Sequence, residues 1–245
     1  RKENVNVRRA KILAVCSPVG SAVNKLPEIV NTATMITLLG GGSVSRQDLD
    51  LALELAPILV AADGGANVAF DWDIRPHAVI GDLDSVERLN AAALGVPLVF
   101  VDDQNSTDLE KCLAKLSAQI ILGVGFFGGR LDHQIAALNA ICLVKDRAVL
   151  LVGSRDVAFR LPNEFTLKLQ QHDRVSLFPM SEVKARSTGL KWALDGLIFR
   201  PNGQIGCSNV ALGGDMTVRV LSGDMLMILP KRLLNATLEA LCCPL

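Results

Sequence analysis

Acidic side chains that follow short apolar runs are the residues best suited to chemistry in this sequence. The segment Gly81-Asp82-Leu83-Asp84-Ser85 comes directly after Ala78–Ile80, a short apolar run. Two carboxylates two residues apart on a turn can both address one cation, and Mg²⁺ prefers hard oxygen ligands while it keeps water and substrate phosphates as the others. A polar turn with an aspartate cap would explain a lone Asp-x-Asp. The other acidic residues nearby favour a metal site.

A third carboxylate, Asp108, opens a segment with helical spacing over residues 107–117. Ser106 or Thr107 is suited to cap this helix, which would put Asp108 in its first turn. Lys111 lies three residues further on and therefore on the same face. Two interpretations stay open at this point. Asp108 either only stabilises the helix or is a third carboxylate of the metal or phosphate site.

Two glycine-rich loops follow predicted strands. Gly40-Gly41-Gly42 comes after Met35–Leu39, and Asp63-Gly64-Gly65-Ala66-Asn67 comes after Ile58–Ala62. Glycine lets backbone N–H groups approach a phosphate closely, and a helix N-terminus favours its negative charge. Neither loop has the Gly-Lys-Ser or Gly-Lys-Thr of the Walker motif. Because strand-to-helix turns need glycine anyway, it is the pair of loops that indicates phosphate binding.

The segment 128–133, Gly-Gly-Arg-Leu-Asp-His, combines a flexible backbone with a forked cation. Arg130 is suited to bidentate contact with a phosphate. Asp132 is suited to cap a helix over 133–144 or to bind substrate. In the second half, Trp192 is one of only two tryptophans. It is either a core or rim aromatic, or a stacking surface for a flat cationic heterocycle, with hydrogen bonds from Ser208 and Asn209.

Composition and charge narrow the class of protein. The formal net charge is zero, there is no Tyr, and aromatic residues make up 4% of the chain, so a nucleic-acid partner is not expected. Residues 34–150 hold eight basic and fifteen acidic side chains, a net charge of −7 that would repel ATP without divalent cations. No apolar stretch approaches membrane-spanning length. Six cysteines without a CxxC pair predict a reducing, cytoplasmic compartment.

The elements that must position these residues alternate between strand and helix up to about residue 152. This alternation predicts a parallel sheet with helices on both faces, whose ligands gather at the carboxyl ends of the strands. The predicted strands are 35–39, 58–62, 78–80, 97–101, 119–124 and 148–152, and the predicted helices are 46–56, 66–71, 107–117 and 133–144.

The second half of the chain has a different sequence pattern, in which short apolar runs are separated by turn residues. This spacing predicts an antiparallel sandwich or barrel. The predicted domains are an extension over 1–33, an α/β domain over 34–153 and a β domain over 154–245. The predicted strands of the β domain are 157–161, 165–169, 174–178, 183–186, 197–200, 217–221 and 225–229.

Six motifs in this order resemble the thiamine pyrophosphokinase family. The four in the α/β region are ADGGAN at 62–67, GDLDS at 81–85, STDLEK at 106–111 and GGRLDH at 128–133. GLKWAL at 189–194 and SN at 208–209 are similar to the family's thiamine-binding module. The resemblance implies a Rossmann-like α/β catalytic domain, followed by a C-terminal antiparallel β-sandwich. It also implies a homodimer whose active sites are each built from both subunits.

The resemblance implies transfer of the pyrophosphoryl group of ATP to the hydroxyl of thiamine, giving thiamine diphosphate and AMP. It implies that Asp82, Asp84 and Asp108 hold Mg²⁺, and that Arg130 and Asp132 contact ATP or the reacting end. Trp192, Ser208 and Asn209 would hold thiamine. The residues expected to bind ATP are Gly41, Gly42, Asp63, Gly64, Gly65, Asn67, Thr107, Lys111, Gly129 and Arg130.

Three alternatives remain at this stage. Asp82-Leu83-Asp84 is also compatible with a haloacid-dehalogenase-type phosphatase, although the motif follows the third predicted strand rather than the first. A pyrophosphokinase that acts on another heterocyclic alcohol, such as a pterin, would use the same carboxylates. A nucleotide-sensing regulatory domain would bind ATP and release no AMP.

Overall fold

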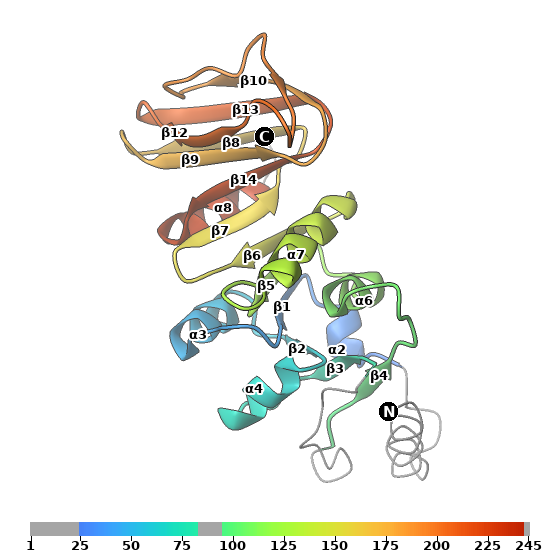
Figure 1. The fold of residues 1–245 in the computed structure, drawn as a ribbon. Coiled ribbons are helices and arrows are strands. Elements are labelled where there is room, and N and C mark those ends of the chain that lie inside the picture. The colour runs from blue at the N-terminus through green and yellow to red at the C-terminus, as the bar shows by residue number, and fades with distance from the viewer. Residues whose placement is uncertain (1–24, 83–94, 243–245) are drawn as a thin grey trace. The chain divides into compact units, whose positions relative to one another are not determined.

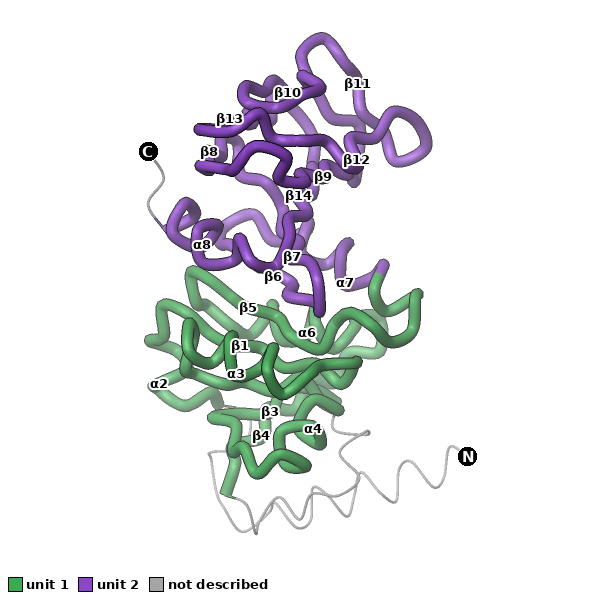
Figure 2. Tube along the Cα trace, turned by 90° about the vertical axis from the view of Figure 1, so that its left-hand side faces the viewer, with its two compact units in different colours: residues 1–134 green, residues 135–245 purple. Residues whose placement is uncertain are grey.

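The computed structural model describes residues 25–82 and 95–242 (Figure 1). Asp84, one of the predicted metal ligands, lies outside the described residues, as does most of the predicted extension. The chain forms two compact units, residues 1–134 and 135–245 (Figure 2). The domain boundary expected near residue 153 stays a prediction.

A parallel sheet of five strands is the centre of the first unit. Its order is β5-β1-β2-β3-β4, and each neighbouring pair is parallel. Every residue of β2, β3 and β5 is buried, as expected for a sheet covered on both faces. The strands are β1 (Met35–Leu39), β2 (Leu59–Ala62), β3 (Ala78–Gly81), β4 (Leu98–Phe100) and β5 (Ile120–Val124).

The helices of this unit lie on both faces of the sheet. Figure 1 shows α3 (Arg46–Leu55) and α4 (Gly65–Asp71) on one side and α6 (Asp108–Lys115) on the other. This is the arrangement that right-handed crossovers require, since the chain moves outward from β1 to β4 and then returns to β5. Ser45 caps α3 by accepting a hydrogen bond from the Asp48 backbone N–H. The parallel sheet and these three helices confirm the α/β prediction.

Two elements at the edges of this unit were not fully predicted. A short helix, α2 (Glu28–Asn31), lies within the segment that we treated as an extension. The last predicted helix is α7 (Leu131–Leu143), which begins two residues earlier than expected. It crosses the division between the two units.

Backbone contacts between loops fix the carboxyl ends of β1, β2 and β5. The Gly40 N–H donates to the Val124 carbonyl over 2.8 Å, and the Gly42 N–H donates to the Gly125 carbonyl over 2.8 Å. A Cβ on Gly65 would lie 2.1 Å from the carbonyl oxygen of Leu39. The loops therefore meet backbone against backbone, and a side chain at Gly65 has no space.

Replacing Gly65 by alanine is expected to lower the free energy of unfolding by about 3 kcal/mol, because the backbone of β1 or α4 must move. Gly129→Ala is the matched control, since a Cβ there would lie 3.8 Å from its nearest neighbour, at ordinary contact distance. Urea denaturation of both variants measures the difference. Equal stabilities would show that the loops separate easily.

The strands of the second unit pair antiparallel in two groups. Those of the first group have the order β12-β9-β14-β7-β6, and those of the second group have the order β11-β10-β13-β8. The strands of the first are β6 (Ala148–Val152), β7 (Asp156–Arg160), β9 (Arg174–Pro179), β12 (Gly206–Val210) and β14 (Met225–Pro230). Those of the second are β8 (Glu164–Leu169), β10 (Val183–Thr188), β11 (Ile198–Phe199) and β13 (Gly214–Ser222).

The core of the second unit lies between these two groups of strands. Phe159 of β7 and Phe165 of β8 are both buried and meet edge to face, with ring centroids 5.3 Å apart. Burial alternates along β8, so one face of that strand points to the core and the other to solvent. The β-sandwich prediction is confirmed.

Strand β6 confirms the sixth predicted strand, and its antiparallel pairing with β7 is where the expected antiparallel half begins. Two features of the second unit correct the sequence analysis. Strand β12 was not predicted, because Gly206–Val210 is short of apolar residues and two of its five are exposed. The last described elements are a 3₁₀ turn, Lys231–Leu233, and helix α8 (Leu234–Cys242), which the β-domain prediction did not include. Across both units, no described helix is long and apolar enough to cross a membrane.

Candidate active site

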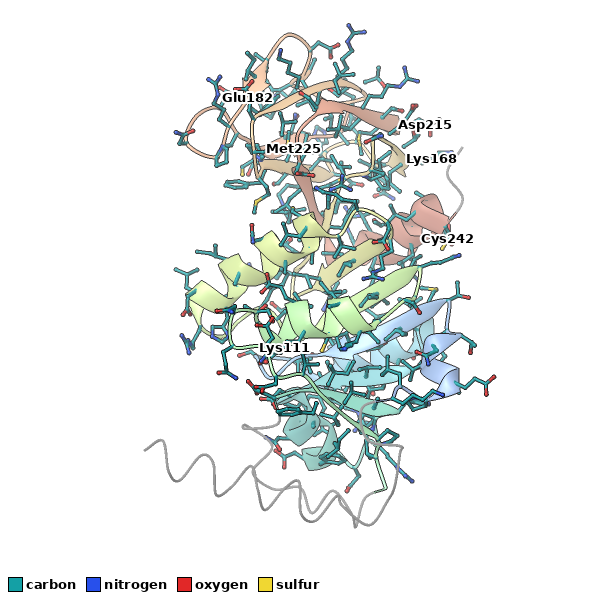
Figure 3. The ribbon with its side chains drawn as sticks, turned by 90° about the vertical axis from the view of Figure 1, so that its right-hand side faces the viewer. Lys111, Lys168, Glu182, Asp215, Met225 and Cys242 are labelled. Carbon is teal, nitrogen blue, oxygen red and sulfur yellow. The ribbon has the colours of Figure 1, made fainter. Side chains whose placement is uncertain are left out.

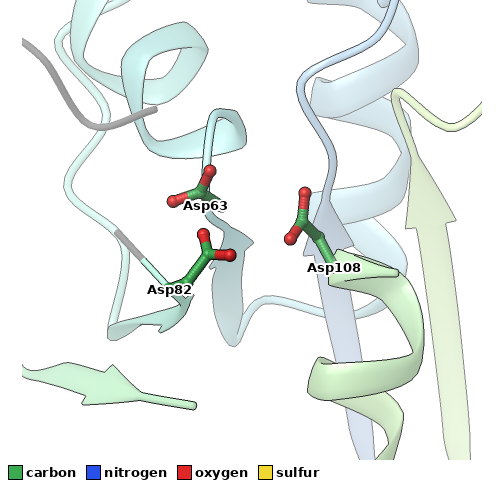
Figure 4. A group of neighbouring side chains, drawn as sticks. All are labelled: Asp63, Asp82 and Asp108. Atoms are coloured by element: carbon green, nitrogen blue, oxygen red, sulfur yellow. The ribbon is translucent and has the colours of Figure 1, made fainter. Parts of the chain in front are cut away.

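Three carboxylates converge at the carboxyl edge of the parallel sheet. Asp63, Asp82 and Asp108 each offer an oxygen, and these oxygens all lie within 4.8 Å of one another (Figure 4). Asp63 follows β2 and Asp82 follows β3, and these strands are parallel neighbours. Asp108 is the first residue of α6. Strand order thus brings together residues that lie far apart in sequence.

Asp63 is held in an unusual backbone conformation. It is buried, and its φ of 36° is in the left-handed region that few non-glycine residues adopt. Its N–H donates to the Ile80 carbonyl over 2.9 Å. A Cβ on Gly81 would lie 2.8 Å from the Asp63 Cβ, so glycine at 81 is what lets the two strand ends approach.

The hydrogen bonds at the N-terminus of α6 show whether the Asp108 carboxylate is needed to cap this helix. Thr107 is the N-cap, and it forms a capping box in which its hydroxyl accepts from the Glu110 N–H and the Glu110 carboxylate accepts from the Thr107 N–H. Capping therefore does not require the Asp108 carboxylate, which is 43% exposed and directed at the other two aspartates. The Thr107 hydroxyl is engaged in the cap, and its contact with nucleotide stays a prediction.

Lys111 supplies the positive charge beside these carboxylates. Its side chain, labelled in Figure 3, is only 4% exposed. Its Nζ donates to Asp82 Oδ2 over 2.9 Å and to Asp108 Oδ1 over 3.4 Å. Burial lowers the pKa of the Lys111 ammonium, but the hydrogen bond and charge of Asp82, with those of Asp108, outweigh it. The pKa is therefore raised above its ordinary value, and the lysine stays charged.

The donor set fits a hard divalent cation. The three clustered ligands are all carboxylates, the type that Mg²⁺ and Mn²⁺ prefer over His or Cys. Cys112 lies nearby on α6, but it is buried and its thiol donates to the Ile80 carbonyl over 3.8 Å. Burial, with the charges of Asp108 and Asp63, raises its pKa well above the ordinary value. A thiolate ligand is therefore not available here.

The structure adds one residue to the carboxylate group that sequence analysis proposed. We expected Asp82, Asp84 and Asp108 as metal ligands and assigned Asp63 only to the nucleotide crevice. Asp63 lies in the group with Asp82 and Asp108. The available signal was that Asp63 and Asp82 both follow buried strands, and the missing information was that those strands are neighbours.

The glycine loops lie at the point where the strand order reverses. Strand β1 lies between β2 and β5, and ligands of doubly wound sheets bind at such a switch point. A Cβ on Gly41 would lie 3.2 Å from the Gly64 carbonyl carbon, so these loops touch. The predicted phosphate-binding residues of this region are therefore together: Gly41, Gly42, Gly64, Gly65, Asn67 and Gly129.

Arg130 and Asp132 form an exposed pair at the start of α7. Arg130 Nε donates to Asp132 Oδ1 over 3.1 Å and Nη2 donates to Oδ2 over 2.5 Å. Both side chains are more than 60% exposed. The hydrogen bond from Arg130 lowers the pKa of Asp132, which makes that carboxylate a weaker base. The fork of Arg130 has the geometry for a phosphate, with Asp132 occupying it in this structure.

The residues predicted to bind the acceptor lie on the second unit. Trp192 is 54% exposed, so it is not a core residue. The Lys191 ammonium lies over its ring, 4.7 Å from the centroid, which shows that the face of the indole accepts a cation. Ser208 is exposed and has a φ of 58°, and its N–H donates to Ser176 Oγ over 3.0 Å. Asn209 is buried and hydrogen-bonds the Trp192 backbone.

The first unit is a doubly wound sheet with three clustered carboxylates at its strand ends. The second unit is a β-sandwich with an exposed tryptophan. These two units together define a class of two-domain enzymes. Residues 49–152 match the family model described as thiamin pyrophosphokinase, catalytic domain. Residues 163–224 match the one described as thiamin pyrophosphokinase, vitamin B1 binding domain. Together the two matches span more than half of the chain, and the chain belongs to the thiamin pyrophosphokinase family.

Similar proteins support this assignment. Thiamine pyrophosphokinase 3 of Oryza sativa subsp. japonica is 28% identical over 207 residues, 70% of this chain and 78% of that protein. Thiamine pyrophosphokinase 2 of Arabidopsis thaliana is 29% identical over 203 residues, 69% and 76% of the two chains.

Solved structures share the fold. Thiamin pyrophosphokinase from Candida albicans has a TM-score of 0.69 at 18% identity, covering 83% of this chain and 91% of that one. The Bacillus subtilis enzyme has a TM-score of 0.66 at 22% identity, covering 80% and 98%. A phosphatase or a nucleotide-sensing domain would not account for matches to both the catalytic and the vitamin-binding models.

Proposed function

We propose that this protein transfers the pyrophosphoryl group of ATP to the hydroxyl of thiamine, forming thiamine diphosphate and AMP. The observation that carries this proposal is the convergence of Asp63, Asp82 and Asp108 at the strand ends of a chain that matches both domains of the family. Carboxylates that can hold a divalent cation beside phosphate-binding loops are what phosphoryl transfer needs, since it depends on positioning and charge neutralisation.

Mg²⁺ would be held by Asp63, Asp82 and Asp108, with Asp84 proposed as a further ligand from the sequence. Bound there, the cation would offset negative charge on the phosphates of ATP. Lys111 keeps the carboxylates in place by bonding two of them from its buried position.

The remaining groups act on the phosphates and the acceptor. Backbone N–H groups of the glycine loops and the N-terminus of α4 favour phosphate oxygens, and Arg130 is suited to bind them when it leaves Asp132. The thiamine oxygen forms a bond to the β-phosphorus, the bond from that phosphorus to the oxygen bridging the α-phosphate breaks, and the hydroxyl proton is released. AMP leaves with the bridging oxygen.

The direct test is incubation with ATP, Mg²⁺ and thiamine, followed by analysis of both products. Formation of AMP and thiamine diphosphate in equal amounts is the expected result. ADP or inorganic phosphate as the product would overturn the proposal. A parallel incubation with a pterin alcohol in place of thiamine tests the alternative acceptor. If AMP forms only in that incubation, the pterin alcohol and not thiamine is the substrate.

Replacing Trp192 by alanine is expected to raise the thiamine KM by about tenfold, with little change in the ATP KM. The reason is the loss of an exposed aromatic face that already attracts the Lys191 ammonium. Steady-state kinetics with each substrate varied in turn measures both constants. Trp72→Phe, at the other tryptophan of the chain, is the control. An unchanged thiamine KM would reject the stacking role.

We also propose that the enzyme is a homodimer with shared active sites and that it works in the cytoplasm, without a nucleic-acid or membrane partner. The exposed apolar side chains Trp192, Leu212 and Leu221 of the second unit support an association surface. The described cysteines Cys112, Cys142, Cys207 and Cys242 are free thiols, which supports a reducing compartment. Light scattering of the purified protein tests the dimer.

A further inference from the structure

We propose that Asn209 is a positioning residue for Trp192 and does not itself contact thiamine. This inference rests on the proposed function and goes beyond it, since the sequence suggested that Asn209 bonds the substrate directly. The structure points to a different role, in which the Asn209 amide holds the backbone of Trp192 so that its indole stays exposed.

The hydrogen bonds of Asn209 carry this inference. The Trp192 N–H donates to Asn209 Oδ1 over 3.1 Å, and Asn209 Nδ2 donates to the Trp192 carbonyl over 2.7 Å. The same Oδ1 also accepts from the Val210 N–H over 2.8 Å. Both backbone groups of Trp192 are thus bonded by one side chain 17 residues away in sequence.

The Asn209 side chain extends the antiparallel pairing of two backbone segments past the point where their own hydrogen bonds end. Leu190 and Ala211 form an antiparallel bridge, and the Lys191 N–H donates to the Val210 carbonyl over 2.8 Å. One step further along, Trp192 meets the amide of Asn209 in place of a peptide group. An asparagine side chain has the same donor and acceptor as a peptide, so it can pair with both groups of Trp192.

Burial separates the roles of Asn209 and its neighbours. Asn209 is 3% exposed, whereas Trp192 is 54% exposed. Ser208, directly before Asn209, is exposed and is fixed in a left-handed conformation with its N–H on Ser176 Oγ. A ligand at this surface would meet the exposed indole, whereas the Asn209 side chain is covered.

Asn209→Asp distinguishes positioning from direct contact. Aspartate keeps an acceptor for the Trp192 and Val210 N–H groups but has no donor, so a carboxylate oxygen would face the Trp192 carbonyl where the 2.7 Å bond now lies. The two oxygens repel, and Trp192 loses its fixed position. If Asn209 instead touched the cationic thiamine, a carboxylate would keep or strengthen binding.

The test combines kinetics with a double-mutant cycle. If Asn209 positions Trp192, Asn209→Asp raises the thiamine KM by about tenfold and leaves the ATP KM unchanged. The double variant Asn209→Asp/Trp192→Ala then has the same thiamine KM as Trp192→Ala alone. Additive effects, or a thiamine KM that is unchanged or lowered, would overturn the proposal. Asn209→Ala, which removes both hydrogen bonds to Trp192 and the one from Val210, replaces Asn209→Asp if the latter does not fold. Asn202→Asp, at an exposed asparagine, is the matched control.

Amide hydrogen exchange at Trp192 keeps this test separate from the proposed function. Asn209→Ala removes the acceptor of the Trp192 N–H, and Asn209→Asp displaces it. In the protein without substrates, each variant is expected to speed exchange of the Trp192 N–H by about tenfold or more. If Trp192→Ala has normal kinetics, the stacking role fails while this measurement still decides on positioning. An unchanged exchange rate in Asn209→Ala would overturn the inference, whatever the activity.

Discussion

Replacing Asp82 by asparagine is expected to lower kcat for AMP formation by about 10²-fold or more while the fold persists. Asparagine has nearly the same shape, so the change removes one negative charge from the group that Asp82 forms with Asp63 and Asp108. That group is where a divalent cation is proposed to bind, and its charge is what attracts the cation. Initial rates measured across a range of Mg²⁺ concentrations should show a raised Mg²⁺ requirement together with the lower kcat.

A matched control isolates the effect of position. Asp50 is on α3, where it accepts a hydrogen bond from Arg46 over 2.8 Å, away from the strand ends. Asp50→Asn removes the same charge and is expected to leave kcat unchanged. Near-normal AMP release by folded Asp82→Asn enzyme would contradict the metal assignment.

Replacing Lys111 by methionine is expected to lower the free energy of unfolding by about 3 kcal/mol in the absence of divalent cations. Methionine keeps most of the apolar stem but removes the ammonium that bonds Asp82 and Asp108. The remaining carboxylates then repel one another, and that of Asp82 is only 10% exposed. Mg²⁺ should restore much of the lost stability, because it supplies positive charge to the same oxygens.

Thermal unfolding with and without Mg²⁺ measures this effect. Lys115→Met is the control, since Lys115 lies one turn further along α6 and is exposed. The Lys111→Met variant should gain more from Mg²⁺ than the control does. Equal gains would mean that the cation and the Lys111 ammonium do not compete for these carboxylates.

The pH dependence of this contribution follows from the raised pKa of Lys111. A lysine whose pKa is raised on folding contributes stability in full below its unfolded pKa of about 10.4, and loses it as pH rises through the folded value. The difference between wild type and Lys111→Met should therefore hardly change between about pH 6 and 9.

Local patterns were enough to predict the parallel sheet, because its strands are continuous apolar runs followed by glycine and aspartate. They were also enough to single out Asp82 and Asp108 as candidate ligands. The pairing of strands was harder to infer, and this is why Asp63 was not assigned to the carboxylate group. Its place there depends on β2 lying next to β3, which no short segment encodes.

The same limit explains the interpretation of Asn209. From sequence, an asparagine beside a serine in a polar segment indicated ligand binding. Its hydrogen-bond partner is Trp192, which is 17 residues earlier, and only the folded β-sandwich brings the two together. Helix α8 was not predicted because the β domain was expected to extend through residue 245.

The buried Lys111 has a further consequence for stoichiometry. Three carboxylates carry three negative charges, and the ammonium cancels one, so this group of described residues has a formal charge of −2. One divalent cation brings it to neutrality, and a second would leave the site positive unless another anion arrived with it. If Mg²⁺ binds here as proposed, the described groups would be neutralised by one ion, and Asp84, the further proposed ligand, would add one negative charge. A second ion would then be expected to enter together with the phosphates of ATP.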